Sequence, residues 1–158
     1  MKRFIYIEEL DFIASIAINK KEKLNMQFLF SGKRYLNFRD VQTLEEITVF
    51  LMKKKGKSNV GFLLWMFAVG EHLKEIFNGK WMLEKRSNIL GEYFVPLIID
   101  SKNDIWMVGD FCYSLYFNKD KMQNIGFNFF YQVYIERKVS KLNLTDLNID
   151  KSNLLKIE

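Results

Sequence analysis

Residues 61–81 read GFLLWMFAVGEHLKEIFNGKW and specify more of the architecture than any other segment. The first half is almost entirely apolar, which predicts a helix buried on several sides. The second half is amphipathic, so we expect a single helix over residues 60–77. Asn78 and Gly79 form a strong helix stop, and Trp81 begins the alternating pattern of a first strand. The segment therefore predicts a buried helix that leads directly into a sheet.

Apolar residues at helical spacing predict three further helices. Two precede the central helix, over residues 7–19 and 40–52, and Asp40 is placed to cap the second of them. The last covers residues 119–138. We therefore expect helices at both ends of the chain.

Strand patterns lie between the central helix and the last one. Residues 80–84 alternate, residues 93–99 form a short apolar run, and a turn at 101–104 leads into a strand at 105–108. Three antiparallel strands in a meander are the simplest arrangement. Residues 142–158 repeat leucines without aromatics, so we expect a loosely packed tail.

These elements predict one α+β domain over residues 1–158, with N-terminal helices, a small antiparallel sheet of about three strands or more, and a C-terminal helix packed on the sheet. Residues 112–117 fit a helix and a strand equally well. The length and the 49% hydrophobic content are sufficient for one substantial core.

Composition also bears on location. The longest nearly continuous apolar run has ten residues, from Gly61 to Gly70, whereas a membrane span needs roughly 20. Glu8, Glu9 and Asp11 interrupt the N-terminal segment, so we expect no signal peptide. A single cysteine suits a reducing compartment. We therefore expect a cytoplasmic protein with no membrane partner.

The net charge of +5 lies in the first 60 residues, which hold 12 basic and 7 acidic side chains. The densest basic run includes Lys53, Lys54 and Lys55, and a second basic segment contains Arg34, Tyr35 and Arg39. Such segments attract acidic partners, either a protein or a nucleic acid. The lysine run is also typical of a solvated loop between helices.

The basic segment around Tyr35 interleaves cations with aromatic rings. This composition is typical of surfaces that bind single-stranded nucleic acid by stacking and phosphate contact. It lacks the glycine pattern of an RNA-recognition motif. Nucleic-acid binding therefore stays an alternative rather than the leading hypothesis.

His72 is the only histidine, so it cannot form a two-histidine metal site within one chain. Glu71 is adjacent and Glu75 lies three residues on, a spacing that suits an acid–base pair or half of a metal site. A polar pair on the helix surface is the simpler interpretation. Similarly, Cys112 is expected to be a buried thiol. We assign no catalytic residue, no metal and no cofactor.

Solvated loops are also the simpler interpretation of the aspartates Asp100, Asp104 and Asp110. The alternative is a carboxylate cluster at one end of the sheet, but the spacing of these residues in the sequence does not match a set of metal ligands. Gly109 and Asp110 are expected to form a turn after the third strand.

From about Asn37 to Phe117 the order of elements resembles a family of small uncharacterised bacterial α+β proteins, some of them found among toxin–immunity and secretion-system genes. The matching pieces are LEEITVFL at 44–51, GEHLKE at 70–75, GKW at 79–81 and the proline in YFVPLII. Lys74 replaces the family's second glycine, and GDF at 109–111 stands where Pro-Phe is usual. The resemblance implies an α+β scaffold and an immunity or partner-binding role.

The leading hypothesis is a non-enzymatic protein-binding module, an immunity-type protein that binds and occludes a cognate bacterial toxin with an acidic surface. Binding surfaces use aromatic anchors and complementary charge. The candidates are Arg34, Tyr35, Arg39, Lys53, Lys54 and Lys55, with a second patch at Glu71, His72 and Glu75. The alternatives are a nucleic-acid-binding module that uses the basic N-terminal part, or an enzyme that uses His72 and Glu75.

Overall fold

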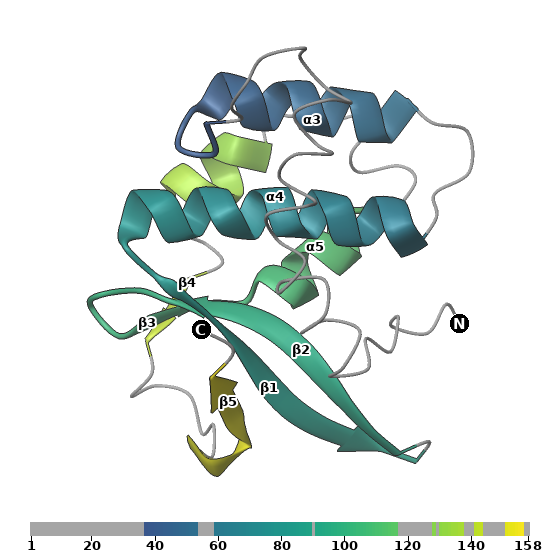
Figure 1. The fold of residues 1–158 in the computed structure, drawn as a ribbon, viewed down its shortest axis with the longest axis vertical. Coiled ribbons are helices and arrows are strands. Elements are labelled where there is room, and N and C mark those ends of the chain that lie inside the picture. Colours follow the sequence, from purple (N-terminus) through teal and green to yellow (C-terminus); the bar gives the residue numbers. More distant parts are fainter. Residues whose placement is uncertain are drawn as a thin grey trace.

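The computed structural model describes residues 37–53, 59–89, 91–116, 128, 130–137, 141–143 and 151–156. Within these residues, the helices α3 (Val41–Lys53), α4 (Asn59–Phe77) and α5 (Val108–Tyr116) gather above an antiparallel sheet (Figure 1). The expected α+β class is confirmed. The predicted helix at 7–19 lies outside the described residues.

The ends of the two long helices follow from local capping. A carboxylate oxygen of Asp40 accepts the N–H of Gln42 at 3.1 Å, so Asp40 is the N-cap of α3 as expected. α4 ends at Phe77 because Asn78 adopts a left-handed backbone with φ 53°. The N–H of Gly79 then bonds to the carbonyl of Lys74 at 2.9 Å, as in a Schellman cap.

Among the described residues, the sheet has five strands in the order β4-β3-β2-β1-β5, and every neighbouring pair is antiparallel. The strands are β1 (Lys80–Asn88), β2 (Gly91–Ile99), β3 (Asp104–Trp106), β4 (Lys141–Asn143) and β5 (Leu154–Lys156). The meander of the first three is confirmed. The described parts of the C-terminal tail supply both edge strands, and a 3₁₀ turn at Lys151–Asn153 leads into β5. The sequence pattern missed these two strands.

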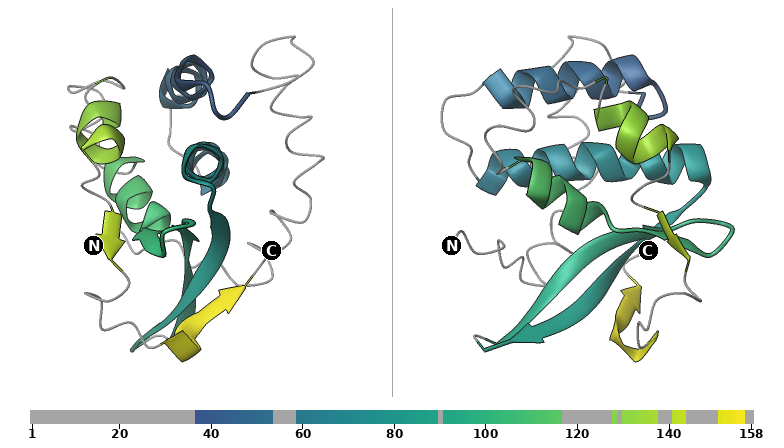
Figure 2. Two further views of the ribbon diagram at one scale, coloured as in Figure 1. Left: turned by 90° about the vertical axis from the view of Figure 1, so that its left-hand side faces the viewer. Right: turned by 180° about the vertical axis from the view of Figure 1, so that it is seen from behind.

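The sheet has two different faces. Trp81, Leu83 and Ile98 point to the main core, where α4 lies between α3 and the sheet (Figure 2). Leu97 and Ile105 belong to a second, smaller cluster on the opposite face. Because successive side chains of a strand point to opposite faces, both sides of β1 and β2 carry apolar groups.

Contact between α4 and the sheet depends on Gly70. A Cβ atom at this position would lie 2.0 Å from Cη2 of Trp81, so only glycine leaves room for the indole. The Trp81 ring is fully buried and is parallel to Phe67 at a centroid distance of 6.3 Å. The expectation that Trp81 fills the core is confirmed.

The expected strand at 105–108 and turn at Gly109 and Asp110 are wrong in part. β3 ends at Trp106, and α5 begins at Val108. Gly109 allows this helix to start directly against β2, because a Cβ there would lie 2.9 Å from Cδ of Pro96. Asp110 lies in the first helical turn, where a negative charge is favourable.

The predicted last helix lies mostly outside the described residues. Its described residues include a π-helix at Tyr131–Glu136. The N–H of Arg137 bonds to the carbonyl of Gln132 at 3.1 Å, five residues back, which is the wider spacing of that helix type.

Candidate functional site

Most of the basic residues proposed from the sequence are not placed by the structure. Arg34, Tyr35, Lys54 and Lys55 lie outside the described residues, and Lys53 is the last residue of α3. The exposed Arg39 donates a hydrogen bond from Nη2 to the backbone carbonyl of a residue on α4, Glu75, at 3.0 Å. It therefore ties the loop before α3 to the end of α4.

The second expected patch does not form on the surface. Glu71 and His72 are both fully buried, whereas Glu75 is exposed. α4 is covered by α3, by α5 and by the sheet, so this turn of the helix faces neighbouring elements rather than solvent. The expectation that His72 and Glu75 form a helix-surface pair is therefore wrong for His72.

His72 joins three parts of the chain. Its Nδ1 lies 2.5 Å from the carbonyl oxygen of Phe38, and because a carbonyl only accepts, Nδ1 carries the proton. Nε2 lies 3.3 Å from the Tyr131 hydroxyl and accepts from it. Burial lowers the pKa of His72, against the opposing effects of the Phe38 bond and the charge of Asp40. A neutral, enclosed imidazole of this kind is a structural group, which does not support the His72 and Glu75 enzyme hypothesis.

Cys112 is buried, as expected. Burial raises the pKa of its thiol well above the usual value, because the thiolate would lose its hydration. A nucleophilic cysteine needs a stabilised thiolate. Cys112 is therefore part of the core.

Asp100 organises the turn between β2 and β3, and the expectation of a solvated aspartate is wrong here. The residue is only 8% exposed. Oδ1 accepts the backbone N–H of Lys102 at 2.8 Å and of Asp104 at 3.0 Å. Oδ2 accepts Nε1–H of Trp106 at 3.2 Å. Three donors thus use the carboxylate to hold the hairpin closed.

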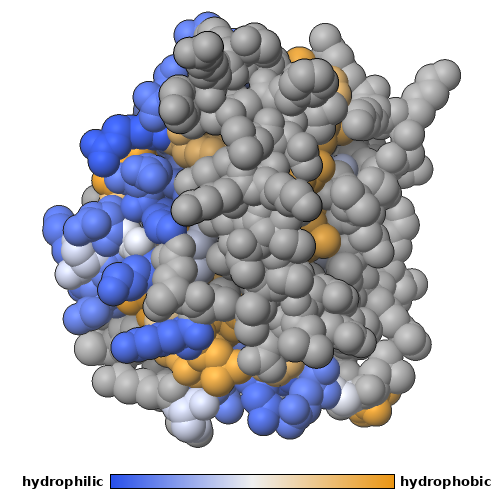
Figure 3. Space-filling model, in the orientation of Figure 1, coloured by the Kyte–Doolittle hydropathy of each residue, from blue (hydrophilic) through white to orange (hydrophobic). Residues whose placement is uncertain are grey.

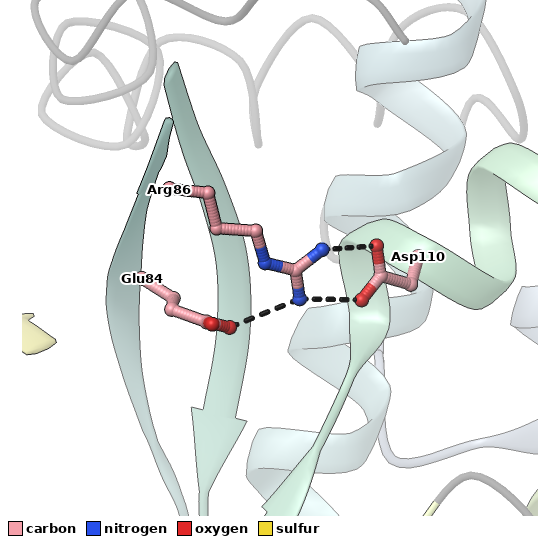
Figure 4. Close-up of polar contacts among 3 residues, drawn as sticks. All are labelled: Glu84, Arg86 and Asp110. Carbon is pink, nitrogen blue, oxygen red and sulfur yellow. Dashed lines mark hydrogen bonds and ion pairs between the residues drawn. The ribbon is translucent and has the colours of Figure 1, made fainter. Parts of the chain in front are cut away.

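Asp110 pairs with Arg86 of β1 (Figure 4). Nη1 and Nη2 of Arg86 lie 3.0 and 2.7 Å from the two carboxylate oxygens, and Nη2 also lies 3.0 Å from Glu84. Partial burial lowers the pKa of Arg86, but the bonds and charges of Asp110 and Glu84 outweigh it and raise the pKa. The fork fixes the start of α5 to β1, so these charges too act within the fold.

No group of three or more His, Cys, Asp or Glu side chains within the described ranges could hold a metal ion. Within the same ranges, no helix is long and apolar enough to cross a membrane.

An open pocket of about 640 Å³ lies where the end of α4, β1 and β5 meet. We call it the β1–β5 pocket. Its apolar floor is formed by Met82, Ile99 and Leu154, which also pack on the second core cluster. Figure 3 shows hydrophobic surface in this region of the molecule, bordered by hydrophilic side chains.

The rim of the β1–β5 pocket is polar. Two exposed lysines, Lys80 and Lys156, lie on it, together with Asn78, Ser101 and Asn103. Both asparagines adopt left-handed backbone conformations, with φ 53° and 62°, so they mark the tight turns that bound the pocket. Asp100 also lines the pocket, but its oxygens are used by the turn.

Strand register places Lys80 and Lys156 on the same face of the sheet as the residues of the pocket floor. Lys80 is opposite Ile99, and Met82 is opposite Lys156. Directly paired residues share a face, as do residues two apart on one strand. Sequence reasoning missed this site. The alternation in residues 80–84 did assign Trp81 to the core, which leaves Lys80 on the other face, but no local signal placed β5 beside it.

No family model matches this chain, and no curated protein or solved structure matches it either.

Proposed function

We propose that this chain is a non-enzymatic protein-binding module that covers an acidic surface of its partner. The observation that carries the proposal is the β1–β5 pocket, where an apolar floor is bordered by the exposed Lys80 and Lys156. An apolar centre with a polar, charged rim is the usual anatomy of a protein interface.

The reactive side chains support binding rather than catalysis. His72 has both ring nitrogens engaged and is buried, and Cys112 is a buried thiol. Asp110 is held by Arg86. Because these groups act within the fold, the exposed chemistry of the described part is recognition by charge and apolar contact.

The charge of the pocket favours an acidic partner. Lys80 and Lys156 are both exposed, and neither forms an ion pair with another described residue. The net charge of the chain is also positive, +5, and adds a long-range attraction for an acidic partner. Charge complementarity of this kind speeds association and selects partners.

The specific form of the proposal is an immunity-type protein that occludes a bacterial toxin. The support is the resemblance in GEHLKE at 70–75 and GKW at 79–81, together with a surface suited to an acidic protein. Gly70 and Trp81 contact each other in the core, so this motif supports the resemblance in scaffold. The support for binding comes from the pocket.

Affinity capture of the tagged full chain from its native lysate at moderate salt tests this function. We expect one stoichiometric protein partner. That partner, expressed alone, should arrest bacterial growth, and co-expression of this chain should restore it. A chain that captures no protein contradicts the binding module, and a captured partner without toxicity contradicts the immunity role.

A further inference from the structure

We propose that the β1–β5 pocket receives an acidic side chain and a neighbouring apolar side chain from one segment of the partner. The carboxylate lies between Lys80 and Lys156, and the apolar group rests on Met82, Ile99 and Leu154. This inference rests on the proposed function, since it takes the partner to be a protein.

Register brings the two ammonium groups within reach of one carboxylate. Met82 is directly opposite Lys156, and Lys80 lies two residues before Met82, so the lysines are diagonal neighbours on one face. Diagonal neighbours across a sheet are about 7–8 Å apart. A lysine side chain is long and flexible enough for both to converge on a single anion.

The remaining rim residues add donors. Asn78, Ser101 and Asn103 border the same pocket and are exposed, and their side chains carry amide and hydroxyl donors. The carboxylate on the rim, Asp100, already accepts three hydrogen bonds from its own turn. A donor-rich rim of this kind fits carboxylate and peptide carbonyl oxygens, which only accept.

The floor distinguishes a peptide from a nucleic acid. Binding of single strands relies on exposed aromatic rings on which bases stack. Trp81 lines this pocket, but its indole points to the main core, where it is fully buried and lies parallel to Phe67. The partly exposed floor is instead aliphatic, which suits a leucine, isoleucine or phenylalanine side chain. A volume of about 640 Å³ leaves room for that side chain and the adjacent acidic one.

A random peptide library displayed on phage and panned against the immobilised full chain tests the inference. We expect enrichment of Asp or Glu next to a large apolar residue. A synthetic peptide of the enriched sequence should lose about tenfold or more in affinity when its acidic residue becomes the matching amide, because charge-assisted contacts are lost. This comparison uses the unaltered protein, so it does not depend on the folding of a variant.

The protein side of the contact is tested by Lys80→Ala combined with Lys156→Ala. This variant should bind the peptide about tenfold or more weakly. The matched control is Lys85→Ala with Arg137→Ala, which removes the same charge at positions that do not line the pocket. Its affinity for the peptide should stay within about twofold of the parent, because neither residue lines the pocket. Its stability should also be retained, because exposed ion pairs such as that of Lys85 contribute little to the free energy of unfolding.

Three results would overturn the inference. The first is enrichment of peptides without acidic residues, and the second is equal peptide affinity of the pocket variant and its control. The third is that no peptide is enriched while decanoate, a fatty acid with a carboxylate and an apolar chain, binds saturably. If a protein is captured from the lysate but any of these results appears, the chain is still a protein-binding module, but it does not bind its partner through the β1–β5 pocket as proposed. If peptides bind as expected but no protein is captured, the proposed function falls instead.

Discussion

At the scale of single residues, two residues on α4, His72 and Gly70, determine how tightly the helices and the sheet pack. His72 connects the helix to Phe38 and Tyr131, and Gly70 admits the ring of Trp81. Both contacts are internal to the protein. Substitutions at these positions should therefore change stability before they change recognition.

The first prediction concerns the pH dependence of stability. The pKa of His72 is lowered in the folded protein, so between the folded value and the unfolded value of about 6.5 the unfolded state binds more protons. The free energy of unfolding should therefore be fully retained above about pH 6.5 and should fall as the pH drops below it. Urea unfolding at intervals from pH 5 to 8 measures this slope.

The control for that titration is His72→Gln, since the chain contains one histidine. The variant should be less stable overall, and the part of the slope due to the imidazole should disappear. An unchanged slope in the variant would show that other groups cause the pH dependence.

The second prediction concerns Gly70→Ala. The added methyl group would lie 2.0 Å from Cη2 of Trp81, so the indole or the helix must shift. We expect a loss of about 3 kcal/mol in the free energy of unfolding, as for overpacked cores. Adding Trp81→Phe, which removes the clashing atoms, should make the double variant less destabilised than the sum of the two single changes. Simple additivity, measured by denaturant unfolding, would contradict the contact.

At the scale of elements, the sequence predicted the parts whose signals are local. The helices expected at 40–52 and 60–77 are observed at Val41–Lys53 and Asn59–Phe77, because their caps and periodicity lie within them. The sequence did not resolve α5, since it begins two residues after the end of β3 and no polar break separates the strand from the helix.

The edge strands were missed for a different reason. β4 and β5 have three residues each and acquire their strand conformation from partners far away in the chain. The same long-range pairing creates the β1–β5 pocket. The candidate site therefore could not be found from local patterns, although the basic character of the chain could.

The third prediction belongs to the hairpin between β2 and β3. Asp100→Asn should lower the free energy of unfolding by about 2 kcal/mol, because one amide oxygen cannot accept the three hydrogen bonds of the buried carboxylate. Ser101→Ala, at the exposed neighbouring position, should change it by less than about 0.5 kcal/mol. Thermal and urea unfolding of both variants provide the measurement, and equal effects would exclude this role for Asp100.

At the scale of the whole molecule, the helices and the sheet have different roles. α3, α4 and α5 enclose the reactive side chains on one side of the sheet. The β1–β5 pocket lies at the meeting of α4, β1 and the edge strand β5. The fold thus presents a basic, apolar-floored surface while its histidine and cysteine stay internal.

The most direct test of this account is a parallel capture from native lysate with three baits: the unaltered chain, Lys80→Ala with Lys156→Ala, and Lys85→Ala with Arg137→Ala. Quantitative mass spectrometry compares the proteins retained at moderate salt. We expect one stoichiometric partner on the first and third baits, and about tenfold less of it on the pocket variant. Equal recovery on all three baits, or no partner on any, would contradict it.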